Sequence, residues 1–347
     1  MTEAPQDGSV SQSSGAHGAG PRRFSGLTAV AQWVSVIASV AFLAWILITR
    51  ADDFKTVLSL DLGLFALISA SALCTFIING VELQLLAGRF GGRIPFRDTM
   101  LLGLMVSTLN YLPMKAGTVI NGLIMRTRHK VRLADFAALV AGSSVIHLWV
   151  GAVSAGVFLL IEGREQGLAW GLVLAPTAVV AALVIWGRRR HEGRYADHGR
   201  RSIRLLARAV DGVGVLFGDA RLLVLDIALN FALVMLASAR MVLAFEALSL
   251  SAPFGSAVVA TALSIVAARL SVIPGALGFK EGGAALGSSA VGIAPAVGLA
   301  ASVIDRAVTL VWLVLLGVPA TYYLLRTTGI HLSLSGRVVD SKGREPE

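Results

Sequence analysis

The sequence predicts an all-α membrane protein: a polytopic helical bundle of two inverted repeats, each with a proline-broken re-entrant hairpin. Its mean hydropathy of +0.75, with 55% hydrophobic and 15% charged residues, lies far from the composition of soluble globular chains. Its apolar runs reach the roughly 20 residues needed to cross a bilayer core. A β-barrel would instead show short alternating segments, and the sequence shows none.

Six apolar runs are the predicted transmembrane spans. The first is too long for the apolar core of a signal peptide, and no small-residue cleavage site follows it, so we expect it to remain as a span. Residues 1–26 before it are rich in Gly, Ser, Ala and Gln and are predicted to form a disordered cytoplasmic tail. The runs are Leu27–Thr49, Leu60–Ala87, Leu133–Ile161, Leu168–Gly187, Leu222–Phe245 and Pro295–Leu325.

Two further apolar runs are each broken by a proline that is followed by a glycine four residues later. The breaks are Leu109–Gly117 and Leu270–Gly278, and a lysine lies close to each, Lys115 and Lys280. Proline removes a backbone donor and clashes with the preceding turn, so each run is predicted to be a helix interrupted inside the membrane. Interrupted helices at matching positions in two halves of a membrane protein indicate a transport-type binding site.

The distribution of arginines predicts the topology. The net charge of +9 is not a nucleic-acid footprint, because the arginines lie between apolar spans. Residues 188–221 carry nine arginines against four acids, which predicts a cytoplasmic loop. Basic clusters at Arg89–Arg97 and Arg126–Arg132 are predicted to lie on that same side. The segment Thr99–Met125 between them is then a re-entrant hairpin from the cytoplasm, since its two arms are too short to span separately.

The second half repeats this pattern from the opposite face. Leu248–Gly255 is uncharged, as an external loop can be, and Ser256–Ile273 and Ala276–Ile293 would form a hairpin that enters from outside. Ser256–Ile273 is itself long enough to span, so a full span is the alternative. The predicted units are a first repeat at 27–161, a second repeat at 162–326 and a cytoplasmic tail at 327–347, in a cell membrane.

Ionisable groups at membrane depth cost roughly 2.5–3.5 kcal/mol each, so they usually face a protein interior or a wet cavity. Glu82, Arg240 and Glu246 lie near predicted helix ends, where they can reach the interface. His147 is expected to be a core histidine satisfied by a neighbour more often than a proton relay. Asp226 and Asn230 are spaced i and i+4, which places both on one face of their helix, directed into the bundle.

The groups around the two breaks form the predicted substrate site. A half-helix that begins after a break directs unpaired amides and a positive dipole end into the membrane, which suits an anion such as a lipid phosphate. The alternative is a structural charge pair, such as Arg269 with Glu281, and an internal ion pair is the simplest account of Asp305 and Arg306. The candidate substrate-binding residues are Asn110, Pro113, Lys115, Gly117, Arg269, Pro274, Gly275, Gly278, Lys280, Glu281, Asp305 and Arg306.

The single cysteine and the glycine pairs are predicted to have structural roles. Cys74 is the only cysteine, which excludes an internal disulfide or a cysteine metal cluster, and it is predicted to be a small core residue. The glycine pairs Gly278-x3-Gly282 and Gly283-x3-Gly287 are predicted to let helix backbones approach closely. No acidic cluster of the kind that holds Mg²⁺ with phosphates is visible. We therefore expect no catalytic residue, no metal site and no cofactor.

The paired signatures resemble the lysylphosphatidylglycerol synthase transmembrane region, also called the flippase-like or UPF0104 family. The resemblance rests on Asn110-x2-Pro113-x3-Gly117 with its downstream basic cluster, and on Pro274-Gly275-x2-Gly278-x2-Glu281 followed by Asp305-Arg306; it covers about residues 27–326. It implies a module that translocates lipids, which in the best-known members is attached to a soluble aminoacyltransferase domain. The chain ends about 20 residues after its last apolar run, so we expect no synthase activity here.

Three functions follow, with a flippase-like transporter for an anionic phospholipid or isoprenoid-phosphate lipid as the leading hypothesis. An accessory membrane subunit for a separate lipid-modifying enzyme is one alternative, and the arginine-rich segment 188–221 is its best support. That segment is also expected to contact anionic lipids. A membrane-embedded transferase for a lipid-linked substrate is the other alternative. Nucleic acid is not an expected partner.

Overall fold

The computed structural model describes residues 61–111, 115–189, 201–271, 273–328, 331–332 and 338–339. Residues 201–208, 274, 331–332 and 338–339 are described by their backbone alone. Within the described residues the chain is helical, apart from β1 (His331–Leu332) and β2 (Val338–Val339), which pair antiparallel. The predicted all-α class is confirmed. The predicted tail at 1–26, the first span Leu27–Thr49 and Pro113 lie outside the described residues.

Five described helices are long and apolar enough to cross a bilayer, which makes the chain a multi-pass membrane protein. They match the predicted spans to within a few residues at either end. In α7 only 11% of the apolar window is buried, so most of its surface is left for lipid. The five are α3 (Leu62–Arg89), α6 (Leu133–Ile161), α7 (Gln166–Arg189), α9 (Ala220–Ala247) and the continuous α12 (Pro295–Trp312), η3 (Leu313–Gly317, a π-helical turn) and α13 (Val318–Thr328).

Four other helices are too short to span. The first pair is α4 (Phe96–Leu109) and α5 (Ala116–His129), with 14 residues each. The second pair is α10 (Phe254–Leu270), with 17 residues, and α11 (Phe279–Ala290), with 12, joined through the 3-10 turn η2 (Pro274–Ala276). At about 1.5 Å per residue none reaches the roughly 30 Å of a hydrocarbon core. Since α10 ends at Leu270, it is shorter than a typical span, which favours the hairpin over the alternative of a full span across Ser256–Ile273.

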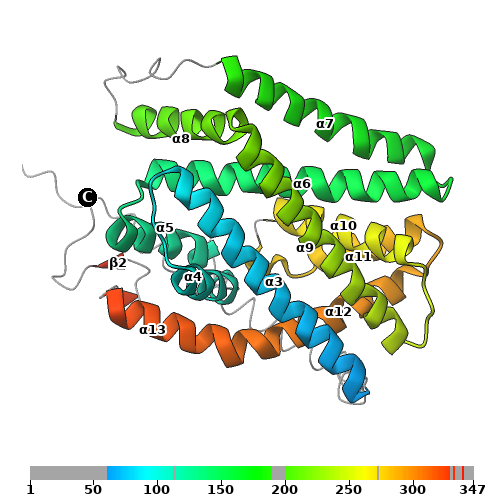
Figure 1. The fold of residues 1–347 in the computed structure, drawn as a ribbon. Helices are drawn as coiled ribbons and strands as arrows, with labels where there is room; N and C mark the ends of the chain where they lie inside the picture. Colours follow the sequence, from blue (N-terminus) through cyan, green and yellow to red (C-terminus); the bar gives the residue numbers. More distant parts are fainter. Residues whose placement is uncertain are drawn as a thin grey trace, which may run out of the picture.

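The two hairpins open toward opposite ends of α6 (Figure 1). The open end of α4 and α5 is joined by an ion pair between Arg128 and Asp98 (3.0 Å), and α5 packs there on the first turn of α6 through Phe136. The open end of α10 rests on the last turn of α6, where the rings of Phe254 and Phe158 meet edge to face at 6.4 Å. This opposition is what an inverted repeat requires, while the repeat itself stays a prediction.

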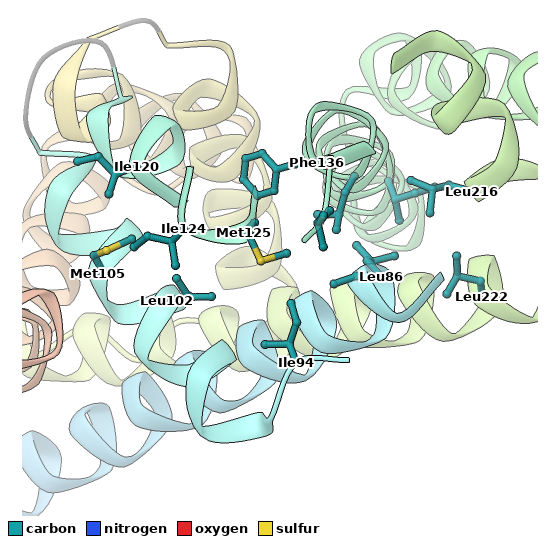
Figure 2. Close-up of a cluster of buried hydrophobic side chains, with 14 of the residues drawn as sticks. Leu86, Ile94, Leu102, Met105, Ile120, Ile124, Met125, Phe136, Leu216 and Leu222 are labelled. Atoms are coloured by element: carbon teal, nitrogen blue, oxygen red, sulfur yellow. The ribbon is translucent and has the colours of Figure 1, made fainter. Parts of the chain in front are cut away.

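A continuous apolar core fixes the first hairpin against the long helices (Figure 2). Side chains from α4 and α5 interdigitate with residues from α3, α6 and α9. Because lipid tails are as apolar as these side chains, close packing rather than exclusion from water favours this contact. The labelled members of the core are Leu86, Ile94, Leu102, Met105, Ile120, Ile124, Met125, Phe136, Leu216 and Leu222.

The predicted basic loop at 188–221 contains a helix, α8 (Arg201–Gly218). Its last turn buries Leu216 and Phe217 in the core. Two glycines allow α8 to approach α6 closely, because a Cβ on Gly142 would meet Leu216 and one on Gly212 would meet Ala138. The apolar side of this segment is therefore packed against the bundle, a contact that its arginine content did not indicate.

Two structural predictions are wrong in part. Gly283 and Gly287 do pack against the backbone of α10, but Gly278 and Gly282 have no atom near the position of a Cβ, so only the second glycine pair serves close packing. Cys74 is exposed rather than buried. It lies on α3, of whose apolar window only 28% is covered by other helices.

Candidate functional site

The two proline breaks lie against each other. The backbone N–H of Gly275 donates to the carbonyl oxygen of Asn110 over 2.8 Å. Gly275 has φ of +60°, and a Cβ there would stand 2.6 Å from the ring of Tyr111, so glycine is needed both for its conformation and for its space. The tips of the two hairpins therefore form one structure, called here the hairpin junction: residues 110–111, 115–118 and 273–281.

The first break is bridged by a side chain. Asn110 Oδ1 accepts from the backbone N–H of Thr118 (3.2 Å) and from its hydroxyl (3.4 Å). Gly117 lies so close to the carbonyl oxygen of Val106 that any larger residue would clash. Lys115 precedes α5 with φ of +50° and is exposed, and within the described chain it has no hydrogen-bond or ion-pair partner. The break thus presents a cationic side chain at membrane depth without a protein counter-charge.

The second break is held by α12. Glu281 Oε2 accepts from the N–H of Gly278 (2.8 Å) and so caps the start of α11. Its other oxygen forms an ion pair with Arg306 Nε at 2.6 Å. Arg306 also donates from Nη1 to the carbonyl oxygen of Gly275 (3.0 Å). Because a half-turn with unpaired carbonyls is costly in a membrane, this guanidinium stabilises the break directly.

Asp305 organises a second ion-pair group next to the junction. Its two oxygens each lie 2.7 Å from a cation, Arg240 Nε on α9 and Lys280 Nζ on α11. Arg240 also donates to Thr75 Oγ1 on α3 over 2.6 Å. The predicted internal ion pairs of Asp305 and Arg306 are confirmed. Four helices are cross-linked around the second hairpin by these contacts.

The charges around the junction do not balance. Arg240, Lys280 and Arg306 face only two carboxylates, those of Asp305 and Glu281. Arg269 on α10 and Lys115 add two more cations, neither with an ion-pair partner within 4 Å among the described residues. The excess positive charge at membrane depth favours an anionic ligand.

Three sequence-based interpretations need correction. Glu281 pairs with Arg306, so the suggested pair of Glu281 with Arg269 does not form. Glu82 and Arg240 are each 7% exposed and bonded inside the bundle rather than extended to the interface. Glu246 does lie exposed near the end of α9. Contacts between helices determine where these charged side chains lie, and such contacts cannot be read from the spacing of charges along the chain.

A second polar group, which the predicted site did not include, lies among α3, α6 and α9. Asn230 Nδ2 donates to both Glu82 Oε1 (3.3 Å) and Asp226 Oδ1 (3.0 Å). His147 Nδ1 lies 2.5 Å from Asn230 Oδ1, and the hydroxyl of Ser143 donates to Glu82 (2.6 Å). We call these five residues the carboxyl cluster. The inward direction of Asp226 and Asn230 and the satisfied state of His147 are confirmed.

The comparisons agree with a helical membrane protein. No curated protein and no solved structure matches the chain. One family model matches, and it spans residues 32–317, which include both hairpins, the junction and the carboxyl cluster. The chain belongs to the family described as the lysylphosphatidylglycerol synthase TM region.

Proposed function

We propose that this protein moves a lipid with an anionic, phosphate-bearing head group between the two leaflets, and that the head group binds at the hairpin junction. One observation carries the proposal: two hairpins that open toward opposite ends of the molecule meet at a point with excess positive charge. A site shared by two such hairpins can be exposed to either face by small movements of one half against the other.

Arg269 and Lys115 are the residues proposed to contact the phosphate. Lys115 lies in the first break and Arg269 precedes the second, and neither forms an ion pair within 4 Å among the described residues. The paired cations Lys280 and Arg306 would hold the hairpin and contribute to the positive field. Guanidinium groups suit phosphate oxygens because they donate two parallel hydrogen bonds.

The choice of a lipid rests on the surroundings and on the family. Long apolar faces border the hairpins, with exposed side chains such as Leu270, Phe279 and Leu286 close to the second break. Acyl chains could stay in the bilayer while the head group passes through the junction. The family description names lysylphosphatidylglycerol, so phosphatidylglycerol is a reasonable first probe.

The proposed activity needs no covalent chemistry, so no catalytic residue is assigned. We place the protein in the cell membrane with the arginine-rich end, and with it both termini, in the cytoplasm, following the positive-inside rule. Anionic lipids of the inner leaflet are the proposed contacts of segment 188–221. An accessory subunit for a separate lipid-modifying enzyme remains the second candidate, and its support is that same segment.

The test uses the purified protein in liposomes with phosphatidylglycerol that carries a fluorescent label quenchable only in the outer leaflet. We expect faster exchange of label between leaflets than in protein-free liposomes. Arg269→Gln and Lys115→Gln should each slow it about tenfold, since a hydrogen bond to a charged group contributes about 1.5–3 kcal/mol. Arg164→Gln is the matched control, because Arg164 is an exposed arginine of the α6–α7 connection, away from the junction.

Two outcomes would contradict the proposal. Exchange equal to that of empty liposomes for labelled phosphatidylglycerol and for a labelled isoprenoid phosphate would favour the accessory subunit. Equal exchange in wild type, Arg269→Gln and Lys115→Gln would move the head-group site away from the junction.

A further inference from the structure

The carboxyl cluster holds two acids in one buried site. Glu82 and Asp226 are 7% and 4% exposed, and the same amide nitrogen, Asn230 Nδ2, donates to both. One nitrogen therefore holds an oxygen of each acid within 3.3 Å, which brings two carboxyl groups together away from water. Two carboxylates this close repel each other at a buried site, so a proton on one of them is favoured.

The charged groups around the carboxyl cluster do not neutralise both of its acids. From α6 comes His147, which is 8% exposed and bonded through Nδ1 to the Asn230 carbonyl oxygen. From α10 the charge of Arg269 acts on Glu82 without an ion pair within 4 Å. From α8 Leu216 and Phe217, which are apolar, line the same pocket as Asp226. Neither carboxylate has an ion-paired cation among the described residues, and a proton on one acid reduces the negative charge of the pair.

A small pocket borders this site. It is lined by Asp226 and otherwise by glycine and apolar side chains of α3, α6, α8 and α9, among them Leu86, Gly142 and Leu216. Asp226 is the polar group at its wall. Asp226 and Asn230 lie one helical turn apart on the buried face of α9, so the pocket lies next to the acid pair.

Arg269 connects this cluster to the hairpin junction. It lies on α10 six residues before Gly275, and Glu82 is a carboxylate whose charge acts on it. When both acids are ionised, the extra negative charge attracts Arg269 toward the cluster. When one acid is protonated, Arg269 is released for an anion at the junction. An anion bound to Arg269 in turn raises the proton affinity of the acid pair, because coupling between two sites is reciprocal.

We propose that Glu82 and Asp226 bind one exchangeable proton, and that this proton binds and moves together with the anionic head group. The proton site stands on the geometry of the cluster alone, whereas its coupling to lipid rests on the proposed function. The proton passes from water to one carboxylate oxygen and returns to water after transport, with no covalent change elsewhere. Acidic conditions on the side from which lipid is taken should favour transport.

The proton is tested directly by infrared difference spectroscopy of the purified protein during a pH titration. Wild type should show a carbonyl-stretch band of a protonated carboxylic acid that disappears as the pH rises. The band should be absent in Glu82→Gln and in Asp226→Asn, both of which preserve shape and hydrogen bonding. Glu246→Gln, an exposed acid on α9, is the matched control and should leave the band unchanged. A wild type without the band, or a band that survives in both variants, overturns the proton site.

The coupling is tested in the same liposomes with an imposed pH gradient. Labelled phosphatidylglycerol should move several-fold faster out of the leaflet that faces the acidic side, and Glu82→Gln should abolish the dependence on the gradient. Transport that is equal in both directions, together with an intact infrared band, would overturn the coupling and leave the proton site standing. An intact band with no lipid movement at all would instead count against the proposed transport function.

Discussion

Arg306 shows at the scale of single residues how a broken helix can persist in a membrane. Its guanidinium contacts Glu281 and donates to the carbonyl oxygens of Gly275 and Ala276, so one side chain satisfies both a buried charge and a broken backbone. Arg306 and Glu281 are 6% and 7% exposed. Such a pair is costly to leave half formed, because the remaining charge has no water to solvate it.

Replacing Arg306 with Gln should therefore destabilise the protein strongly, by about 3–5 kcal/mol, the usual cost of removing one partner of a buried pair. The unfolding temperature in detergent, followed by tryptophan fluorescence, measures the loss. The double variant Glu281→Gln with Arg306→Gln should recover part of it, since no unpaired charge remains. A double variant less stable than Arg306→Gln alone would show that the pair is not the main contribution.

Gly275 and Gly278 form a matched pair of positions. Both have positive φ, +60° and +80°, but a Cβ would meet Tyr111 only at Gly275 and open space at Gly278. Gly278→Ala should cost the backbone strain alone, about 1–2 kcal/mol. Gly275→Ala should cost more and lower lipid exchange as well, because it separates the two breaks. Equal unfolding temperatures for the two variants would contradict a tight contact between the hairpins.

At the scale of helices, the second hairpin depends on close backbone packing. A Cβ on Gly287 would stand 2.6 Å from Cα of Ala260, whereas Gly282 on the same helix has no atom near that position. Gly287→Ala should therefore push α11 from α10 and lower the unfolding temperature. Gly282→Ala should be neutral or stabilising by up to about 1 kcal/mol, owing to the higher helix propensity of alanine. The reverse order would disprove this packing.

The orientation of the helices is open to a labelling experiment in a Cys74→Ser background, which is needed because Cys74 is exposed. Arg93→Cys, in the connection before α4, and Ser249→Cys, in the connection before α10, are both exposed. A membrane-impermeant maleimide should label Arg93→Cys only from the cytoplasmic face and Ser249→Cys only from outside. Labelling of both from one face would contradict the opposed hairpins.

At the scale of the whole molecule, hydropathy was enough to predict the five described spans, and the proline breaks were enough to predict the two pairs of short helices. Long apolar runs are read directly from the sequence because only a helix satisfies their backbone in lipid. Contacts between helices were not predictable in the same way. The correct partner of Glu281 lies 25 residues away on α12, and the carboxyl cluster joins residues from three helices. Nothing in the local pattern around Glu82 indicates its burial.

The two hairpins contact each other at their proline breaks, and the other helices hold each hairpin in place. The first hairpin is fixed in the apolar core, and the second is fixed by two ion pairs to α12, which is itself paired with α9. In this account the lipid head group binds where both hairpins meet, so both must contact it.

Photo-crosslinking tests this claim most directly, with a phosphatidylglycerol that carries a photoreactive group beside its phosphate. Mass spectrometry of the wild-type protein should find crosslinks in peptides from both hairpin tips, around residues 110–118 and 269–281. Unlabelled phosphatidylglycerol and Arg269→Gln should both reduce them. Crosslinks confined to lipid-facing surfaces such as α7, and unchanged in Arg269→Gln, would contradict a head-group site at the junction.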